Sequence, residues 1–118
     1  PSEIILIFGC GGNRDKGKRK QMALVASKYA DKVIVTNDNP RDENPRDILN
    51  AIEKNLSVNN EVIESRENAI KRGLMLVKKK GILLIAGKGH ENFQEIKGVK
   101  IPFSDKQVAL SNIGLINH

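Results

Sequence analysis

Three short polar stretches contain the side chains of this sequence that could do chemistry. Residues 9–16 pass from glycines into alternating acids and bases, residues 37–44 contain two Asn-Pro steps, and residues 87–92 begin with GKGHE. Each stretch follows an apolar run, so each is expected where a strand ends. The lone His90 has no second His or Cys at metal-ligand spacing, so we expect it to be structural.

The second stretch offers the clearest set of binding groups. Asp38, Asn39 and Arg41 put an acid, an amide and a guanidinium side by side, on a turn that Pro40 stiffens. Such a set suits a zwitterion, because the acid accepts from an ammonium group while the arginine clamps a carboxylate. The alternative is an Asx turn that only joins a strand to a helix. From the residues alone, both interpretations stay open.

The glycine-rich first stretch fails both common nucleotide-binding patterns. Read from Gly9, the dinucleotide pattern G-x-G-x-x-G needs glycine where Arg14 stands. Residues 12–18 begin a P-loop pattern, but that pattern needs Ser or Thr where Arg19 stands. We therefore do not expect a phosphate cradle. Arg14 is a fork-shaped donor in an accessible loop, so a charged-ligand site competes with a simple tight turn.

The surrounding apolar pattern predicts the strands that carry these stretches. Strands are expected at residues 3–8, 32–36, 61–64 and 81–86. All but the third are continuous apolar runs, which are typical of strands buried on both faces. Between the strands, helices are expected over 17–30, from 45, and over 66–79. This alternation predicts an α/β fold, a three-layer Rossmann-like sandwich around a mainly parallel sheet.

Capping residues and apolar spacing mark where the helices begin. Asn44 and Ser65 are expected as N-caps of the second and third helices. The expected apolar stripe of the first helix is Met22, Val25, Ala26, Tyr29 and Ala30. Residues 93–104 alternate around Gly98 and predict a C-terminal β-hairpin. Ser104 and Gln107 then form a capping box that opens a short last helix.

This fold would bring the three polar stretches to one edge. In parallel sheets flanked by helices, ligands bind beyond the carboxyl ends of the strands. All three stretches follow such ends, so the sequence predicts one shared site there.

Composition limits the class of protein. The chain has 118 residues and a formal net charge of +6, which fits one domain. Its single cysteine, Cys10, cannot form an internal disulfide, which favours a reducing, cytoplasmic location and a structural role. No apolar run approaches the ~20 residues of a membrane span. The basic residues are scattered and aromatic residues are few, so we expect neither a nucleic acid nor a membrane as partner.

Taken together, the three stretches resemble a known family. FGCGGNRDKGKR, TNDNPR and AGKGHENFQ are similar to motifs of the C-terminal domain of the Mur ligases, in the same order and over nearly the whole chain. The similarity is greatest to the branch that adds diaminopimelate. Asn13 and Lys20 depart from the residues common in the family, without removing a binding position.

The resemblance implies an activity for the full-length protein. Such ligases use ATP and Mg2+ to phosphorylate the glutamate side chain of UDP-N-acetylmuramoyl-L-alanyl-D-glutamate, and the incoming amine attacks the acyl phosphate. The product serves peptidoglycan synthesis, and so cell shape and division. Residues 1–118 would be the amino-acid-binding domain, a fragment lacking the N-terminal and central ATPase domains. The fragment alone is expected to be inactive and monomeric, with no catalytic residue or metal ligand of its own.

The resemblance also implies roles for individual residues. The diamino acid, meso-diaminopimelate or a close analogue with two carboxylates, would be bound by Arg14, Asp38, Asn39, Pro40, Arg41, Gly87 and Glu91. The cations that would face ATP or the acyl phosphate are Lys16, Lys18 and Arg19. The nucleotide-sugar dipeptide would bind through the missing domains. The alternative is a free-standing Rossmann-like nucleotide-binding module without ligase activity.

Overall fold

A four-stranded parallel sheet forms the centre of the computed structural model, which describes residues 3–12, 17–86, 93–96 and 99–116. Its strands are β1 (Ile4–Phe8), β2 (Lys32–Val35), β3 (Asn59–Val62) and β4 (Ile82–Ile85), in the order β3-β2-β1-β4. Strand β1 pairs with β2 on one side and with β4 on the other. All four run in the same direction, so their carboxyl ends meet at one edge, called here the carboxyl edge.

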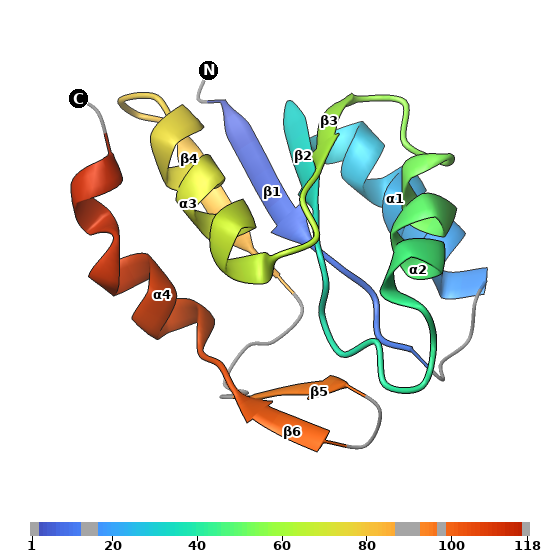
Figure 1. The fold of residues 1–118 in the computed structure, drawn as a ribbon. Helices are drawn as coiled ribbons and strands as arrows, with labels where there is room; N and C mark the ends of the chain where they lie inside the picture. The colour runs from blue at the N-terminus through green and yellow to red at the C-terminus, as the bar shows by residue number, and fades with distance from the viewer. Residues whose placement is uncertain (1–2, 13–16, 87–92, 97–98, 117–118) are drawn as a thin grey trace.

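Helices cover both faces of the sheet (Figure 1). Helices α1 (Gly17–Tyr29) and α2 (Pro45–Glu53) lie on one face, and α3 (Arg66–Leu76) and α4 (Asp105–Ser111) on the other. The chain moves outward from β1 to β3 and then returns across the sheet to β4. Right-handed crossovers in opposite directions must place their helices on opposite faces. The predicted three-layer α/β sandwich is confirmed.

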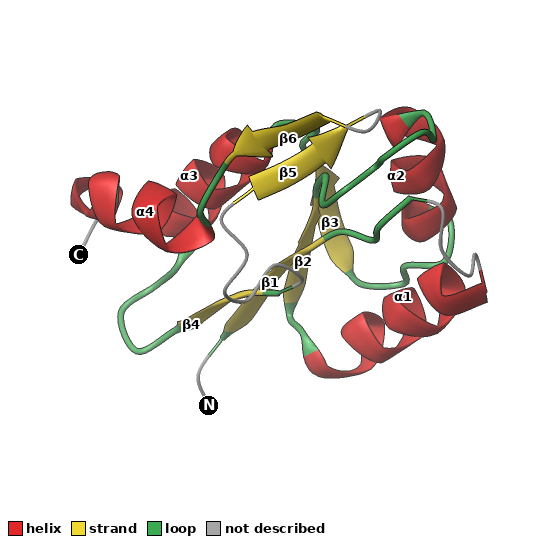
Figure 2. Ribbon diagram, turned by 90° about the horizontal axis from the view of Figure 1, so that it is seen from below, coloured by secondary structure: helices red, strands yellow, loops and turns green. Residues whose placement is uncertain are grey.

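An antiparallel hairpin of β5 (Phe93–Ile96) and β6 (Val99–Pro102) follows β4, as predicted. It lies beyond the carboxyl edge of the sheet, and Figure 2 looks onto that edge from the hairpin's side. The short 3-10 helix η1 (Ile113–Leu115) follows α4. The hairpin therefore lies at the end of the sheet where the polar stretches begin, as a separate two-stranded sheet.

The predicted helix caps are all present. The Asn44 side chain accepts a hydrogen bond from the Arg46 backbone N–H at 2.9 Å. The hydroxyls of Ser65 and Ser104 accept from backbone N–H groups three residues later, at 3.2 and 3.3 Å. These contacts satisfy N–H groups that the first helical turn leaves without partners.

Two elements differ from the sequence prediction by more than one residue at an end. Strand β3 occupies Asn59–Val62 rather than 61–64, because its pairing begins with Asn59 opposite Lys32 of β2. Helix α3 ends at Leu76 rather than at 79. Residues 78–80 therefore follow the helix in a turn, where Lys80 has a positive φ of 68°.

The expected burial of α1 and β4 is wrong in part. Ala23 and Ala26 of helix α1 are buried against the sheet, as is Ala30 directly after the helix. In contrast, Met22, Val25 and Tyr29 are 39–66% exposed. On β4, Ile82 and Leu84 are about half exposed. The cause is that no helix among the described residues covers β4 on the side of α1. An apolar groove of about 430 Å³ lies there between α1, β1 and β4.

Candidate functional site

The carboxyl edge brings the first two polar stretches into direct contact. The backbone N–H of Gly12 donates to the Asn39 carbonyl at 2.6 Å. A Cβ on Gly12 would lie 1.7 Å from the Pro40 carbonyl oxygen, and one on Gly9 would lie 2.2 Å from that of Thr36. Neither distance is possible for a real side chain. These two glycines therefore let the two loops pack backbone against backbone. The space beside the glycines, which a bound phosphate would need, is occupied by the backbone of the second loop.

The segment 38–41 is held firmly at this edge. Asn39 is 3% exposed and Pro40 is fully buried, while Asp38 and Arg41 are half-buried. Arg41 has a left-handed backbone with φ of 54°, which is uncommon outside glycine and concentrates at functional sites. Its Nη1 donates to the carbonyls of Gly12 at 3.0 Å and Asn39 at 3.3 Å. The predicted acid, amide and guanidinium thus lie on one turn fixed by the glycine loop.

Arg19, which is expected near a phosphate from the family resemblance, has its side chain buried within the domain. It is only 5% exposed, forms an ion pair with Glu43 and donates to the Gly11 carbonyl at 3.4 Å. Its position joins the glycine loop to the segment that follows Arg41. Lys18, in contrast, is exposed. Spacing along the sequence cannot tell these two cations apart, because burial depends on the distant Glu43.

Four of the predicted site residues lie outside the described residues. These are Arg14, Lys16, Gly87 and Glu91, and His90 lies there too. Their neighbours Gly12, Gly17 and Ala86 are described. The roles expected for the four residues stay predictions.

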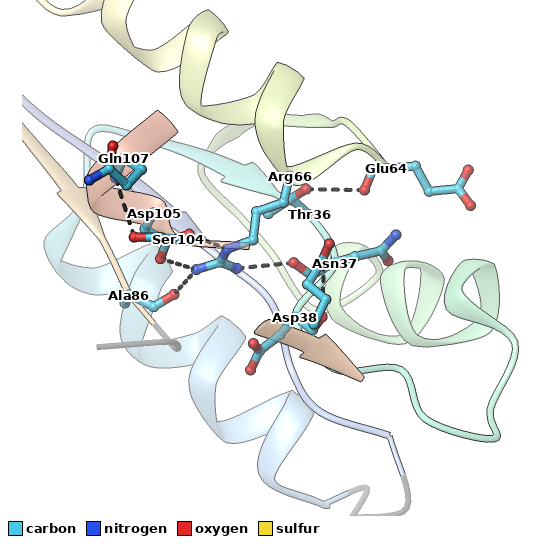
Figure 3. A network of polar contacts seen from close by, with 10 residues as sticks. Thr36, Asn37, Asp38, Glu64, Arg66, Ala86, Ser104, Asp105 and Gln107 are labelled. Atoms are coloured by element: carbon cyan, nitrogen blue, oxygen red, sulfur yellow. Dashed lines mark hydrogen bonds and ion pairs between the residues drawn. The ribbon is translucent and has the colours of Figure 1, made fainter. Parts of the chain in front are cut away.

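Sequence reasoning missed Arg66, the largest fully buried side chain among the described residues. It is the first residue of α3 and donates through Nε and Nη2 to the two carboxylate oxygens of Asp105, at 2.7 Å each. Further bonds reach the carbonyls of Asn37 at 3.0 Å and Ala86 at 3.1 Å (Figure 3). A signal was present: a cation opposes the helix dipole in the first turn, so an arginine there needs a specific partner.

Cys10 lies within the carboxyl edge but is not set up as a nucleophile. Burial raises the pKa of its thiol to about 11, an effect that the nearby Arg19 charge reduces and the Asp38 charge increases. Its Sγ lies 3.6 Å from the Met22 Sδ. A thiol with so high a pKa is almost entirely protonated near neutral pH and reacts poorly, which agrees with the structural role expected from the sequence.

Neither a metal centre nor a membrane-spanning helix is present among the described residues. No group of three or more His, Cys, Asp or Glu side chains within them could hold a metal ion. No helix in that part of the chain is long and apolar enough to cross a membrane. The apolar groove beside β4 contains none of the predicted binding residues, so the polar carboxyl edge is the candidate site.

Comparison with known proteins gives a consistent result. The family model "Mur ligase, glutamate ligase domain" matches residues 1–89. A UDP-N-acetylmuramoyl-L-alanyl-D-glutamate–2,6-diaminopimelate ligase of Aquifex aeolicus is 47% identical over 95% of this chain and 24% of the relative. The ligase of the same name from Phocaeicola vulgatus is 50% identical over 89% and 22%.

A solved structure of a ligase with this name superimposes with a TM-score of 0.91 at 39% identity, covering all of this chain and 25% of that one. The chain thus spans about a quarter of the length of the curated relatives it matches.

Proposed function

The chain belongs to the family of Mur ligase glutamate ligase domains, and from this premise we propose that it is the amino-acid-binding domain of an ATP-dependent ligase. The full-length enzyme joins meso-diaminopimelate to UDP-N-acetylmuramoyl-L-alanyl-D-glutamate for peptidoglycan synthesis in the cytoplasm. The names of relatives that are 47–50% identical support 2,6-diaminopimelate as the amino acid added. The fixed contact between the glycine loop and segment 38–41 carries the proposal.

The chemistry of that segment matches a diamino acid. Each end of diaminopimelate carries an ammonium and a carboxylate, so its binding site needs both an acceptor and a cation. Asp38 supplies the acceptor and Arg41 the cation, within one turn. Arg41 uses Nη1 to contact Gly12 and Asn39, which orients the planar guanidinium for a carboxylate. The proposed set is completed by Arg14, Asn39, Pro40, Gly87 and Glu91.

The domain's part in the reaction is to hold the incoming amine. ATP with Mg2+ supplies the phosphoryl group that activates the glutamate carboxylate. The described residues do not fit a magnesium site, since no suitable cluster of ligands occurs among them. We therefore assign ATP and Mg2+ to other parts of the ligase. Lys16 and the exposed Lys18 are the cations of this chain that we expect nearest the phosphate.

Substitution of Arg41 tests the proposal through substrate choice. Lysine lacks one of the two carboxylates of diaminopimelate, so discrimination depends on the group that receives that charge. We expect Arg41→Ala in the full-length ligase to lower kcat/KM for diaminopimelate by roughly 10²-fold, which is ~2.7 kcal/mol. The value for lysine, already low, should change little. The measurement is the ratio of the two specificity constants before and after the change.

Two further variants make this result specific. Arg46 is exposed on the first turn of α2, so Arg46→Ala should leave the ratio unchanged. Arg41→Lys keeps a positive charge near Gly12 but loses the bidentate geometry of the guanidinium. It should retain only part of the parent enzyme's preference for diaminopimelate over lysine. An equal fall for both substrates would contradict the assignment, because Arg41 would then support only the loop or the shared end of the amino acid.

A further inference from the structure

The Arg66 guanidinium joins parts of the carboxyl edge that the sheet itself does not connect. Strands β2 and β4 lie on either side of β1 and do not pair with each other. Arg66 reaches the carbonyl of Asn37 after β2 and that of Ala86 after β4. One planar group therefore spans the end of β1. It fixes the distance between the chain after β2 and the chain after β4.

Both of these carbonyls lie directly before proposed substrate-binding residues. Asn37 precedes Asp38, the first residue of segment 38–41, and Ala86 precedes Gly87. The Asp38 carbonyl also accepts a hydrogen bond from Gln94 Nε2 of β5, at 2.9 Å. The ends of β2 and β4 are thus joined by Arg66, and the hairpin is joined to the same segment by Gln94.

Asp105 holds Arg66 in this orientation. The carboxylate accepts hydrogen bonds from Nε and Nη2 in a bidentate contact. In this orientation Nη1 donates to the Asn37 carbonyl, and Nη2 also donates to the Ala86 carbonyl (Figure 3). Asp105 is the first residue of α4, is 8% exposed, and lies 39 positions from Arg66 in sequence. The bidentate contact fixes the plane of the guanidinium, not only its location.

Stability alone is a weak explanation for this arrangement. Desolvation of two charges offsets most of their attraction, and well-packed apolar residues often stabilise a protein as well. What an apolar replacement could not do is hold two backbone carbonyls at set positions. Arginine is suited to this, because its donors have a rigid geometry.

We propose that Arg66 and Asp105 are positioning residues that set the affinity for the incoming diamino acid without touching it. They do so by fixing where the chain leaves β2 ahead of segment 38–41, relative to the end of β4 at Ala86. The inference rests on the proposed function, since it takes segment 38–41 to bind the diamino acid. Misplacement of this segment by a fraction of an ångström should weaken binding of the diamino acid and of no other substrate.

The test is steady-state kinetics of the full-length ligase, with diaminopimelate, ATP and the nucleotide-sugar dipeptide varied in turn. Arg66→Lys keeps the charge but cannot hold both carbonyls and Asp105 together. We expect its KM for diaminopimelate to rise about 10-fold or more, while the KM values for the other two substrates stay within about threefold. Asp105→Asn keeps the shape of the side chain and should produce a smaller rise in the same KM.

Arg72→Lys is the matched control. Arg72 is on the same helix and also pairs with a carboxylate, Glu61, but it is 41% exposed and makes no contact at the carboxyl edge in the described structure. All three KM values should stay as in the parent enzyme. Melting temperatures of every variant identify those that are folded at the assay temperature.

Several outcomes would overturn the inference. An unchanged KM for diaminopimelate in folded Arg66→Lys, or an equal rise in all three KM values, would assign the network to general stability. Loss of folding in both Arg66→Lys and Asp105→Asn would do the same. A parent enzyme that does not add diaminopimelate would contradict the proposed function and this inference with it, whereas an active parent with unchanged variants would contradict only the role of Arg66.

Discussion

Two arginine–carboxylate ion pairs of helix α3 lie in different surroundings. Arg66 at its first residue pairs with Asp105, and their side chains are 0% and 10% exposed. Arg72, further along the helix, pairs with Glu61 of β3, and these side chains are 41% and 29% exposed. Lys32 of β2 joins the second pair, with its Nζ 2.9 Å from Glu61 Oε2.

The difference lies in what else each arginine contacts. Arg66 also donates to two backbone carbonyls, so it fixes the path of the chain. Within the described part of the chain, the hydrogen bonds of Arg72 go to the two Glu61 carboxylate oxygens and to no backbone carbonyl. Hydrogen bonds from Arg72 and Lys32 lower the pKa of Glu61 from 4.5 to about 2. The first pair therefore determines geometry, whereas the second mainly changes the charge balance of an exposed surface.

Removal of each arginine tests this comparison most strongly. Arg66→Met leaves Asp105 buried without a counterion and takes the donor from two carbonyls, so the free energy of unfolding should fall by about 3–5 kcal/mol. Arg72→Met disturbs only a solvent-accessible pair, so the free energy of unfolding should fall much less than in Arg66→Met. Urea unfolding followed by circular dichroism measures both. Equal losses would remove the distinction between the two pairs.

Glycine substitutions extend the comparison to the backbone. Gly12→Ala would put a methyl group against the Pro40 carbonyl and force the two loops apart, at a cost of about 1–3 kcal/mol. A Cβ on Gly114 in η1 meets nothing within 4 Å, so Gly114→Ala should be neutral or slightly stabilising. The same unfolding experiment compares them. If Gly12→Ala proved as stable as Gly114→Ala, the loops would not be packed as tightly as described.

The smallest expected effect is the pH dependence of the exposed pair. The pKa of Glu61 is lower in the folded chain than its ordinary value of 4.5, so folding favours the charged form. The stabilisation is present above pH 4.5 and is lost as the pH falls toward 2. Glu61→Gln should be less stable than the parent by under about 1 kcal/mol at pH 7. That gap should close on acidification, and a constant gap would show that ionisation of Glu61 does not cause it.

The fold could be predicted largely from local patterns. The order of strands and helices, the hairpin and the three N-caps were all correct, because caps and periodicity depend on residues a few positions apart. The ends of β3 and α3 were displaced, because pairing with β2 and the turn at 78–80 decide where those elements stop. The exposure of β4 depends on whether a helix covers it. The residues of the strand itself do not indicate whether such a helix is present.

The candidate site was predicted in outline only. Segment 38–41 was found because its residue types are unusual together, and its contact with the glycine loop followed from the parallel sheet. The ion pairs of Arg66 and Arg19 were not predicted, since their carboxylate partners lie 39 and 24 positions away. No residue near either arginine in the sequence indicates that the arginine pairs with a carboxylate of this domain. The one exception is the position of Arg66 in the first turn of a helix.

The sequence by itself determined the alternating α/β pattern, the helix starts and the gathering of polar stretches at one edge. These follow from side-chain periodicity and short-range hydrogen bonds, which neighbouring residues already specify. Only the tertiary structure decided which arginines are buried, why Gly9 and Gly12 must lack a side chain, and that the Arg41 backbone is left-handed. Each of these depends on atoms contributed by segments far apart in the chain, and their approach exists only once the sheet has formed.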